Sequence, residues 1–176
     1  MSGRPRSSPI HRDKKTICQD LEIILGQACY ALSIGAKYAV IDQALNLWSS
    51  HEGKYSGCQY WTPEAILAAH EHLRYEGQGL APPYEHRIVH EHIIPRNIIR
   101  DILLNSQSLI ASEIESLLKL YCVGAIITKP QDDKLTKAKL RASMPNQWQP
   151  GDIWARYRIC ELKIVDRHNN DELVQL

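Results

Sequence analysis

The stretch VHEHIIPRNIIRD, residues 89–101, decides how the rest of the chain is interpreted. Two histidines flank a glutamate, an isoleucine pair follows, and Pro95 interrupts the run. β-branched residues mixed with polar ones predict a strand, on which His90 and His92 share one face and Glu91 points to the other. Glu91 and His92 can therefore serve one site only if the strand ends or bulges there, an irregularity that Pro95 favours.

Two zinc arrangements are disfavoured by the same residues. His86 and His90 are spaced four apart and would share a face of a helix, but the β-branched residues around them make a helix unfavourable. The HExxH spacing of zinc proteases is absent from the sequence.

The overall composition is that of a globular chain. Its 176 residues are enough for one domain with a sizeable core. Charged residues make up 23% and the net charge is +1, so there is no general signal for nucleic acid. Basic residues nevertheless gather in residues 1–15 and 129–158. No apolar run approaches the roughly 18 residues of a membrane span, and no apolar segment follows the basic N-terminus. We expect a soluble, cytoplasmic protein.

The cysteines predict free thiols. They are odd in number and form no CxxC pair, which argues against a zinc ribbon and against a disulfide framework. Buried thiols in a reducing compartment are the expected state. The five are Cys18, Cys29, Cys58, Cys122 and Cys160.

The pattern along the chain predicts an α+β fold: a helical N-terminal half followed by a two-strand-and-helix core with a helical insertion between the strands. Residues 1–14 are expected to be a disordered basic arm and 15–176 a single globular domain, with a helical part (15–80), the core (81–145) and a C-terminal strand or tail (146–176). Helices are expected from Thr16, over 36–49, 62–77, 97–104 and 112–121, and over 129–142, and strands over 88–94 and 122–128.

Helix signals at three places support these boundaries. Thr62 and Pro63 are typical of a helix start. Ser112 with Glu115, and Thr128 with Gln131, have the spacing of a capping box.

The sequence EHIIPR, residues 91–96, resembles the first motif of the HNH, or ββα-metal, endonucleases, which is commonly Asp-His, a β-branched pair and proline. The resemblance implies two strands and a helix around one divalent metal ion. It makes Glu91, in place of the usual aspartate, a metal ligand and His92 the general base. CVGAIITK (122–129) and PQDDKLTKAKL (130–140) would be the second strand and the helix.

The resemblance also implies a last metal ligand in that helix. Asp133 is preferred and Asp132 is the alternative. Carboxylate ligands suit Mg²⁺ or Mn²⁺. The central asparagine of the motif has no clear counterpart, since Asn97 and Asn105 do not have the usual spacing. YWTPEA, LRASMP and WARY add a looser similarity to small phage and prophage proteins.

The chemistry implied is phosphodiester hydrolysis of nucleic acid, with DNA favoured over RNA. Neutral His92 would take a proton from water while the metal ion stabilises charge on the phosphate. The basic residues expected to contact phosphates are Arg96, Lys134, Lys137 and Arg141.

Three simpler interpretations stay open. His90 and His92 are equally well explained as hydrogen-bonded strand residues, Asp132 and Asp133 as a favourable helix N-terminus, and the lysines as a solvated face. The alternative function is a non-catalytic module that binds nucleic acid or protein on a degenerate HNH-like scaffold, and a homodimer is compatible with either function. Convergence of Glu91, His92 and one of the two aspartates would favour the nuclease.

Overall fold

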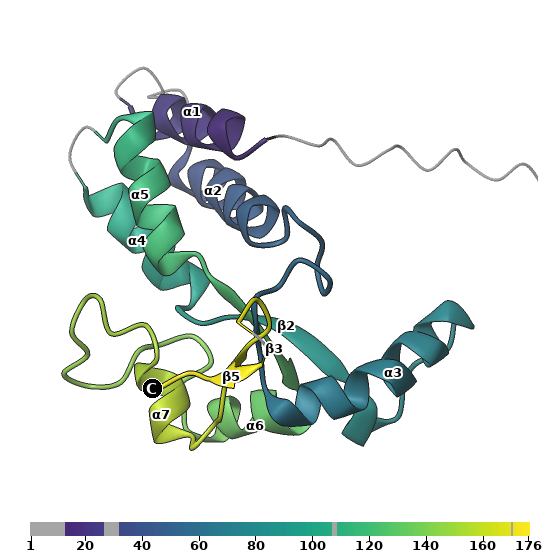
Figure 1. Ribbon diagram of the computed structural model, residues 1–176. Helices are drawn as coiled ribbons and strands as arrows, with labels where there is room; N and C mark the ends of the chain where they lie inside the picture. Colours follow the sequence, from purple (N-terminus) through teal and green to yellow (C-terminus); the bar gives the residue numbers. More distant parts are fainter. Residues whose placement is uncertain (1–12, 27–31, 107–108, 170) are drawn as a thin grey trace, which may run out of the picture.

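The computed structural model describes residues 13–26, 32–106, 109–169 and 171–176. The basic arm predicted for residues 1–14 lies outside the described residues except for its last two. Lys14 begins the first helix and Asp13 caps it, since the Asp13 side chain accepts a hydrogen bond from the backbone N–H of Thr16 at 2.7 Å. The fold is α+β, as predicted (Figure 1).

The two predicted strands pair as expected. β2 (Ile88–His92) and β3 (Gly124–Thr128) are antiparallel, with register partners running from Ile88↔Thr128 to His92↔Gly124. Three two-residue strands extend this pair to a sheet of order β2-β3-β1-β4-β5: β1 (Tyr60–Trp61), β4 (Val165–Asp166) and β5 (Glu172–Leu173). β1 runs parallel to β3.

The helix after β3 lies against both main strands, as predicted, but it is shorter. α6 (Lys129–Lys137) begins where the Gln131 side chain accepts a hydrogen bond from the backbone N–H of Thr128 at 2.9 Å. It ends four residues before Arg141, and Lys139 adopts a positive φ of 60°. Arg141 therefore does not share a helical face with the lysines of α6, contrary to the expected helical spacing.

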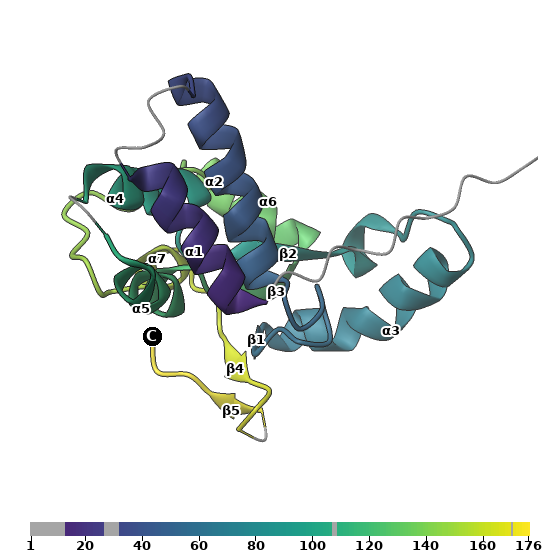
Figure 2. The same ribbon diagram turned by 90° about the horizontal axis from the view of Figure 1, so that it is seen from above.

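Four helices form a separate layer at one end of the sheet (Figures 1 and 2). They are α1 (Lys14–Leu25), α2 (Ile34–Ser49), α4 (Arg96–Asn105) and α5 (Ala111–Tyr121). α4 and α5 are the predicted insertion between β2 and β3, and their buried Ile99, Leu103, Ile114 and Leu118 share one apolar core with α1 and α2. The insertion is thus what completes the N-terminal helical core.

The start of α5 differs from the prediction. The Glu113 side chain accepts a hydrogen bond from the backbone N–H of Ile110 at 3.0 Å, so the helix begins at Ala111. Ser112 lies inside the helix and does not cap it, because the acidic residue that reaches back is Glu113 and not Glu115.

α3 (Pro63–Gly77) packs along the opposite part of the sheet and extends away from the helical layer (Figure 1). Thr62 caps it as predicted, by accepting a hydrogen bond from the backbone N–H of Ala65. Buried His72 of α3 accepts a hydrogen bond at Nδ1 from the backbone N–H of Ile88, which holds the start of β2. The 3-10 helix η2 (Tyr84–His86) joins α3 to β2.

The C-terminal segment is neither one long strand nor an irregular tail. It forms the short helix α7 (Ala155–Ile159) and then β4 and β5. α7 places Tyr157 in a second apolar core beneath β3, together with Ile127 and Leu135. Among the described residues, no helix is long and apolar enough to cross a membrane.

Candidate functional site

A cleft of about 430 Å³ opens where β2 ends and α4 begins, between the helical layer and α6. Five of the eight site residues predicted from the sequence line it: Glu91, His92, Arg96, Asp132 and Arg141. The other three lie elsewhere. Lys134 and Lys137 line a separate depression beside α7, and Asp133 is turned toward Tyr84 of η2, to which it is hydrogen-bonded.

Glu91 is held in a buried ion pair. Nη2 of Arg156 donates to both carboxylate oxygens, at 3.0 and 2.9 Å, and the Tyr157 hydroxyl donates to Oε2 at 3.1 Å. The side chain of Arg156 is fully buried and that of Glu91 is 11% exposed. Burial raises the pKa of Glu91, and Arg156 and Tyr157 oppose that rise. Since all three contacts come from donors, they stabilise the ionised carboxylate.

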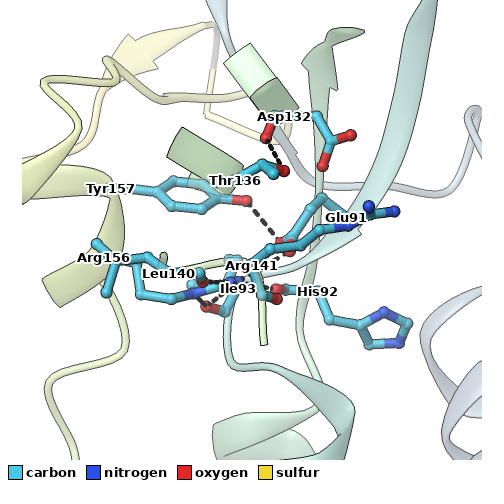
Figure 3. A network of polar contacts seen from close by, with 9 residues as sticks. All are labelled: Glu91, His92, Ile93, Asp132, Thr136, Leu140, Arg141, Arg156 and Tyr157. Carbon is cyan, nitrogen blue, oxygen red and sulfur yellow. Dashed lines mark hydrogen bonds and ion pairs between the residues drawn. The ribbon is translucent and has the colours of Figure 1, made fainter. Parts of the chain in front are cut away.

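Arg156 also binds the backbone around Glu91 (Figure 3). Its Nε and Nη2 donate to the carbonyl of Ile93 at 2.9 and 2.8 Å, and Nη2 also donates to the carbonyl of His92. Nη1 donates to the carbonyl of Leu140 at 2.6 Å and to that of Arg141 at 3.3 Å. One buried guanidinium therefore joins the end of β2 to the loop after α6.

Glu91 and His92 point in opposite directions. In Figure 3 the Glu91 carboxylate faces Arg156 and Tyr157, while the His92 ring points away from them. β2 stays regular through both residues, with Glu91 opposite Ala125 and His92 opposite Gly124. The strand irregularity that would bring both side chains into one site is therefore not present in β2.

His92 lies against the helical layer. Its Nε2 is 2.9 Å from the hydroxyl oxygen of Ser49 at the end of α2, and its ring meets the ring of His90 edge-on, with 5.5 Å between centroids. His90 in turn lies across Gly124: a Cβ at that position would be 2.4 Å from Nε2 of His90. The glycine in CVGAIIT is thus explained by the space that the His90 ring needs.

The surroundings of both rings favour the neutral imidazole. Burial, followed by the neighbouring His90 and Arg96, lowers the pKa of His92 to about 3. Burial and Lys54 lower the pKa of His90. A neutral imidazole is the form that accepts a proton, but a general base works best when its pKa is near the working pH. His92 in this environment is a weak base.

The aspartate pair at the start of α6 binds Lys129. Its Nζ lies 2.6 Å from Oδ2 of Asp132 and 2.6 Å from Oδ1 of Asp133. Lys129 and the Tyr84 hydroxyl lower the pKa of Asp133. Asp132, the alternative in the sequence prediction, is buried and lines the cleft, whereas the preferred Asp133 does not.

The carboxylates of the cleft do not fit a divalent ion in this arrangement. Both oxygens of Glu91 accept from Arg156, and Asp132 is paired with Lys129. A metal ligand needs free lone pairs directed at one point. Within the described part of the chain, no group of three or more His, Cys, Asp or Glu side chains is placed to hold a metal ion.

The basic side chains of the cleft are less fully paired. Arg100 pairs with Asp42 at 3.0 Å. Arg96 donates to the side-chain oxygen of Asn46 at 2.7 Å and has no carboxylate partner among the described residues. Exposed Arg141 has no side-chain partner among them either. Two arginines of the cleft, Arg96 and Arg141, thus carry positive charge that is not paired with a carboxylate among the described residues.

The start of α4 adds to that charge. Pro95 precedes the helix, and no side chain caps its first N–H groups. The unpaired N–H groups at a helix N-terminus carry partial positive charge and can bind anions. Pro95, Arg96 and Asn97 all line the cleft, so this helix end faces the same space as Arg141.

Sequence reasoning missed the role of Arg156. Residues 129–158 are rich in basic side chains, and nothing in the local spacing relates this one to Glu91, 65 residues earlier. The available signal was its setting in WARY, where a charged residue stands among apolar and aromatic ones. An arginine in such a run is often buried against an acidic partner.

Comparisons of the chain with protein-family models, with curated proteins and with solved structures gave no match.

Proposed function

We propose that this chain is a non-catalytic nucleic-acid-binding module on a degenerate HNH-like scaffold. The observation that carries the proposal is the charge of the cleft. Every carboxylate that lines it is paired with a basic side chain, whereas Arg96 and Arg141 have no carboxylate partner among the described residues. Such a cleft attracts a polyanion.

Phosphate groups fit this cleft chemically. An arginine can donate two parallel hydrogen bonds to phosphate oxygens, and the uncapped start of α4 offers further N–H donors. Arg141 lines the same cleft as that helix end, and the Asn97 side chain of α4 donates to the carbonyl of neighbouring Ala142 at 2.9 Å, so one bound phosphate would meet both sets of donors. Contacts of this kind position a nucleic acid without reading its sequence.

The test measures the binding of labelled single-stranded DNA, duplex DNA and RNA by fluorescence anisotropy at several KCl concentrations. We expect salt-sensitive binding, with DNA bound at least as well as RNA. The double variant Arg96→Gln/Arg141→Gln should lower the slope of log K against log salt by about two, roughly one for each lost phosphate contact.

The matched control is Arg158→Gln, which removes an exposed arginine of α7 that is paired with Asp152. It should leave the slope unchanged. A wild-type protein that binds none of the three nucleic acids at low salt would refute the proposal.

A second candidate is the metal-dependent endonuclease that the HNH resemblance implies. It is favoured by one observation: Glu91, His92 and Asp132 line the same cleft. In this function His92 would be the general base, and Mg²⁺ or Mn²⁺ would be held by Glu91 with Asp132 or Asp133. Arg156 would first have to release Glu91, because it now occupies both carboxylate oxygens.

A cleavage assay separates the two candidates. Plasmid, single-stranded DNA and RNA are incubated with wild-type protein in Mg²⁺, Mn²⁺ or EDTA. Metal-dependent cleavage that His92→Ala lowers by about 10²–10⁴-fold would establish the nuclease. Binding without cleavage in any metal is the result expected of the binding module.

We also propose that the protein works in the cytoplasm. The four cysteines that lie among the described residues are all free thiols, and three of them are buried. Free cysteines are typical of a reducing compartment.

A further inference from the structure

The carboxylate of Glu91 stands at the strand position where the HNH resemblance places a metal ligand. In this chain a cationic side chain of the protein itself, the guanidinium of Arg156, already contacts that carboxylate. Nη2 of Arg156 lies 3.0 and 2.9 Å from the two oxygens of Glu91, and its side chain is fully buried. The guanidinium and the Tyr157 hydroxyl use three of the roughly four lone-pair sites of this carboxylate, so a metal ion would have to compete with a buried cation for it.

The guanidinium is held firmly. All three of its nitrogens donate hydrogen bonds, to Glu91 and to the carbonyl groups of Ile93, His92, Leu140 and Arg141. These acceptors leave it no unused donor nitrogen and surround it on several sides. Releasing Glu91 would therefore require several hydrogen bonds in a buried site to break together, which is costly because each group would be left unpaired.

We propose that Arg156 takes the place of a divalent cation beside Glu91, so that the cleft binds nucleic acid without a metal ion. The inference rests on the binding function proposed above. A metal ion would neutralise the acidic residue and fix the strand end, and Arg156 does both with one side chain. It also donates to the backbone carbonyl of Arg141 and so helps to position the segment that carries this arginine of the cleft.

The first experiment uses the wild-type protein, with Glu91→Gln as its control. Mn²⁺ is added in millimolar amounts, binding is followed by isothermal titration calorimetry, and the melting temperature is recorded with Mn²⁺ and with EDTA. We expect neither a binding signal that Glu91→Gln removes nor a metal-dependent melting temperature. Nucleic-acid affinity should be the same in Mg²⁺ and in EDTA, once ionic strength is matched.

The second experiment removes the guanidinium from beside Glu91. Arg156→Gln leaves Glu91 as a carboxylate without its cation, so this variant should gain an Mn²⁺-dependent rise in melting temperature. Adding Glu91→Gln to it should abolish the gain. Arg156→Lys, which keeps a positive charge, should not show it, and neither should the surface control Arg158→Gln.

The outcomes separate this inference from the proposed function. Mn²⁺ binding by wild-type protein that is lost in Glu91→Gln overturns the inference, even where nucleic acid is bound. Nucleic-acid binding that EDTA abolishes also overturns it. Absence of nucleic-acid binding refutes the proposed function alone, because the metal titration of the free protein still tests whether Arg156 occupies the cation position. If Arg156→Gln does not fold, the Mn²⁺ calorimetry, the melting temperatures and the nucleic-acid affinities in Mg²⁺ and EDTA still test the inference on the wild-type protein.

Discussion

Acidification should destabilise the protein through His92. The side chain is partly buried beside His90 and Arg96, and desolvation followed by these two neighbours lowers its pKa to about 3, whereas an unfolded chain has a histidine pKa of about 6.5. Between these two values the unfolded state binds a proton that the folded state does not. Stability is therefore lost as the pH falls through this window, and it is fully present above it.

The expected size follows from the same two values. From pH 7 to pH 5 the protonation of His92 in the unfolded chain alone should lower the free energy of unfolding by about 2 kcal/mol. The figure does not depend on the exact folded pKa, provided that it lies below about 4, because the ring is then neutral in the fold at both pH values.

The perturbation that isolates this effect is His92→Gln, whose amide can still meet the Ser49 hydroxyl. Urea unfolding is measured for both proteins at pH 7, 6 and 5. The wild type should lose about 2 kcal/mol more than the variant between pH 7 and pH 5. His70→Gln removes a histidine whose side chain is 87% exposed on α3, and it should follow the wild type. Equal losses in wild type and His92→Gln would refute the neutral state of His92 in the fold.

Three further substitutions test other parts of the structure. Glu91→Gln should lower the free energy of unfolding by about 3 kcal/mol in urea at pH 7, since it leaves a buried guanidinium without its carboxylate. Gly124→Ala should cost about 1–3 kcal/mol in the same assay, because the new Cβ would lie 2.4 Å from Nε2 of His90. Lys137→Gln should leave the salt dependence of nucleic-acid binding unchanged, because Lys137 lies outside the cleft; a loss equal to that of Arg141→Gln would place the binding surface on α6 instead.

The main pair of strands and α6 could be predicted because their signals are local. CVGAIIT is short, apolar and β-branched, and Thr128 with Gln131 marks the start of the helix that follows it. The two-residue strands could not be predicted in this way. Tyr60–Trp61 is too short to show an alternating pattern, and it is a strand only because it pairs with Ala125 and Ile126.

The candidate site was predictable only in part, for a related reason. Glu91, His92 and Arg96 belong to one short motif, so their nearness follows from the sequence. The position of Asp132 rather than Asp133 in the cleft depends on the rotation of α6 about its axis, which the helix signal does not fix. Arg156 reaches Glu91 through the packing of α7, a five-residue helix with no clear sequence signal.

The register of β2 is the strongest argument for binding over catalysis. An acid and a base on consecutive residues can serve one reacting phosphate only where the strand turns, because regular strands send neighbouring side chains to opposite faces. Here the ladder continues past His92, since the backbone N–H of Ile93 donates to the carbonyl of Val123 at 2.9 Å. Glu91 is thereby committed to Arg156 on one side and His92 to Ser49 on the other. Among the described residues that line the cleft, Arg96 and Arg141 are the basic side chains without a carboxylate partner, and an arginine attracts and positions a phosphate but takes no proton from water.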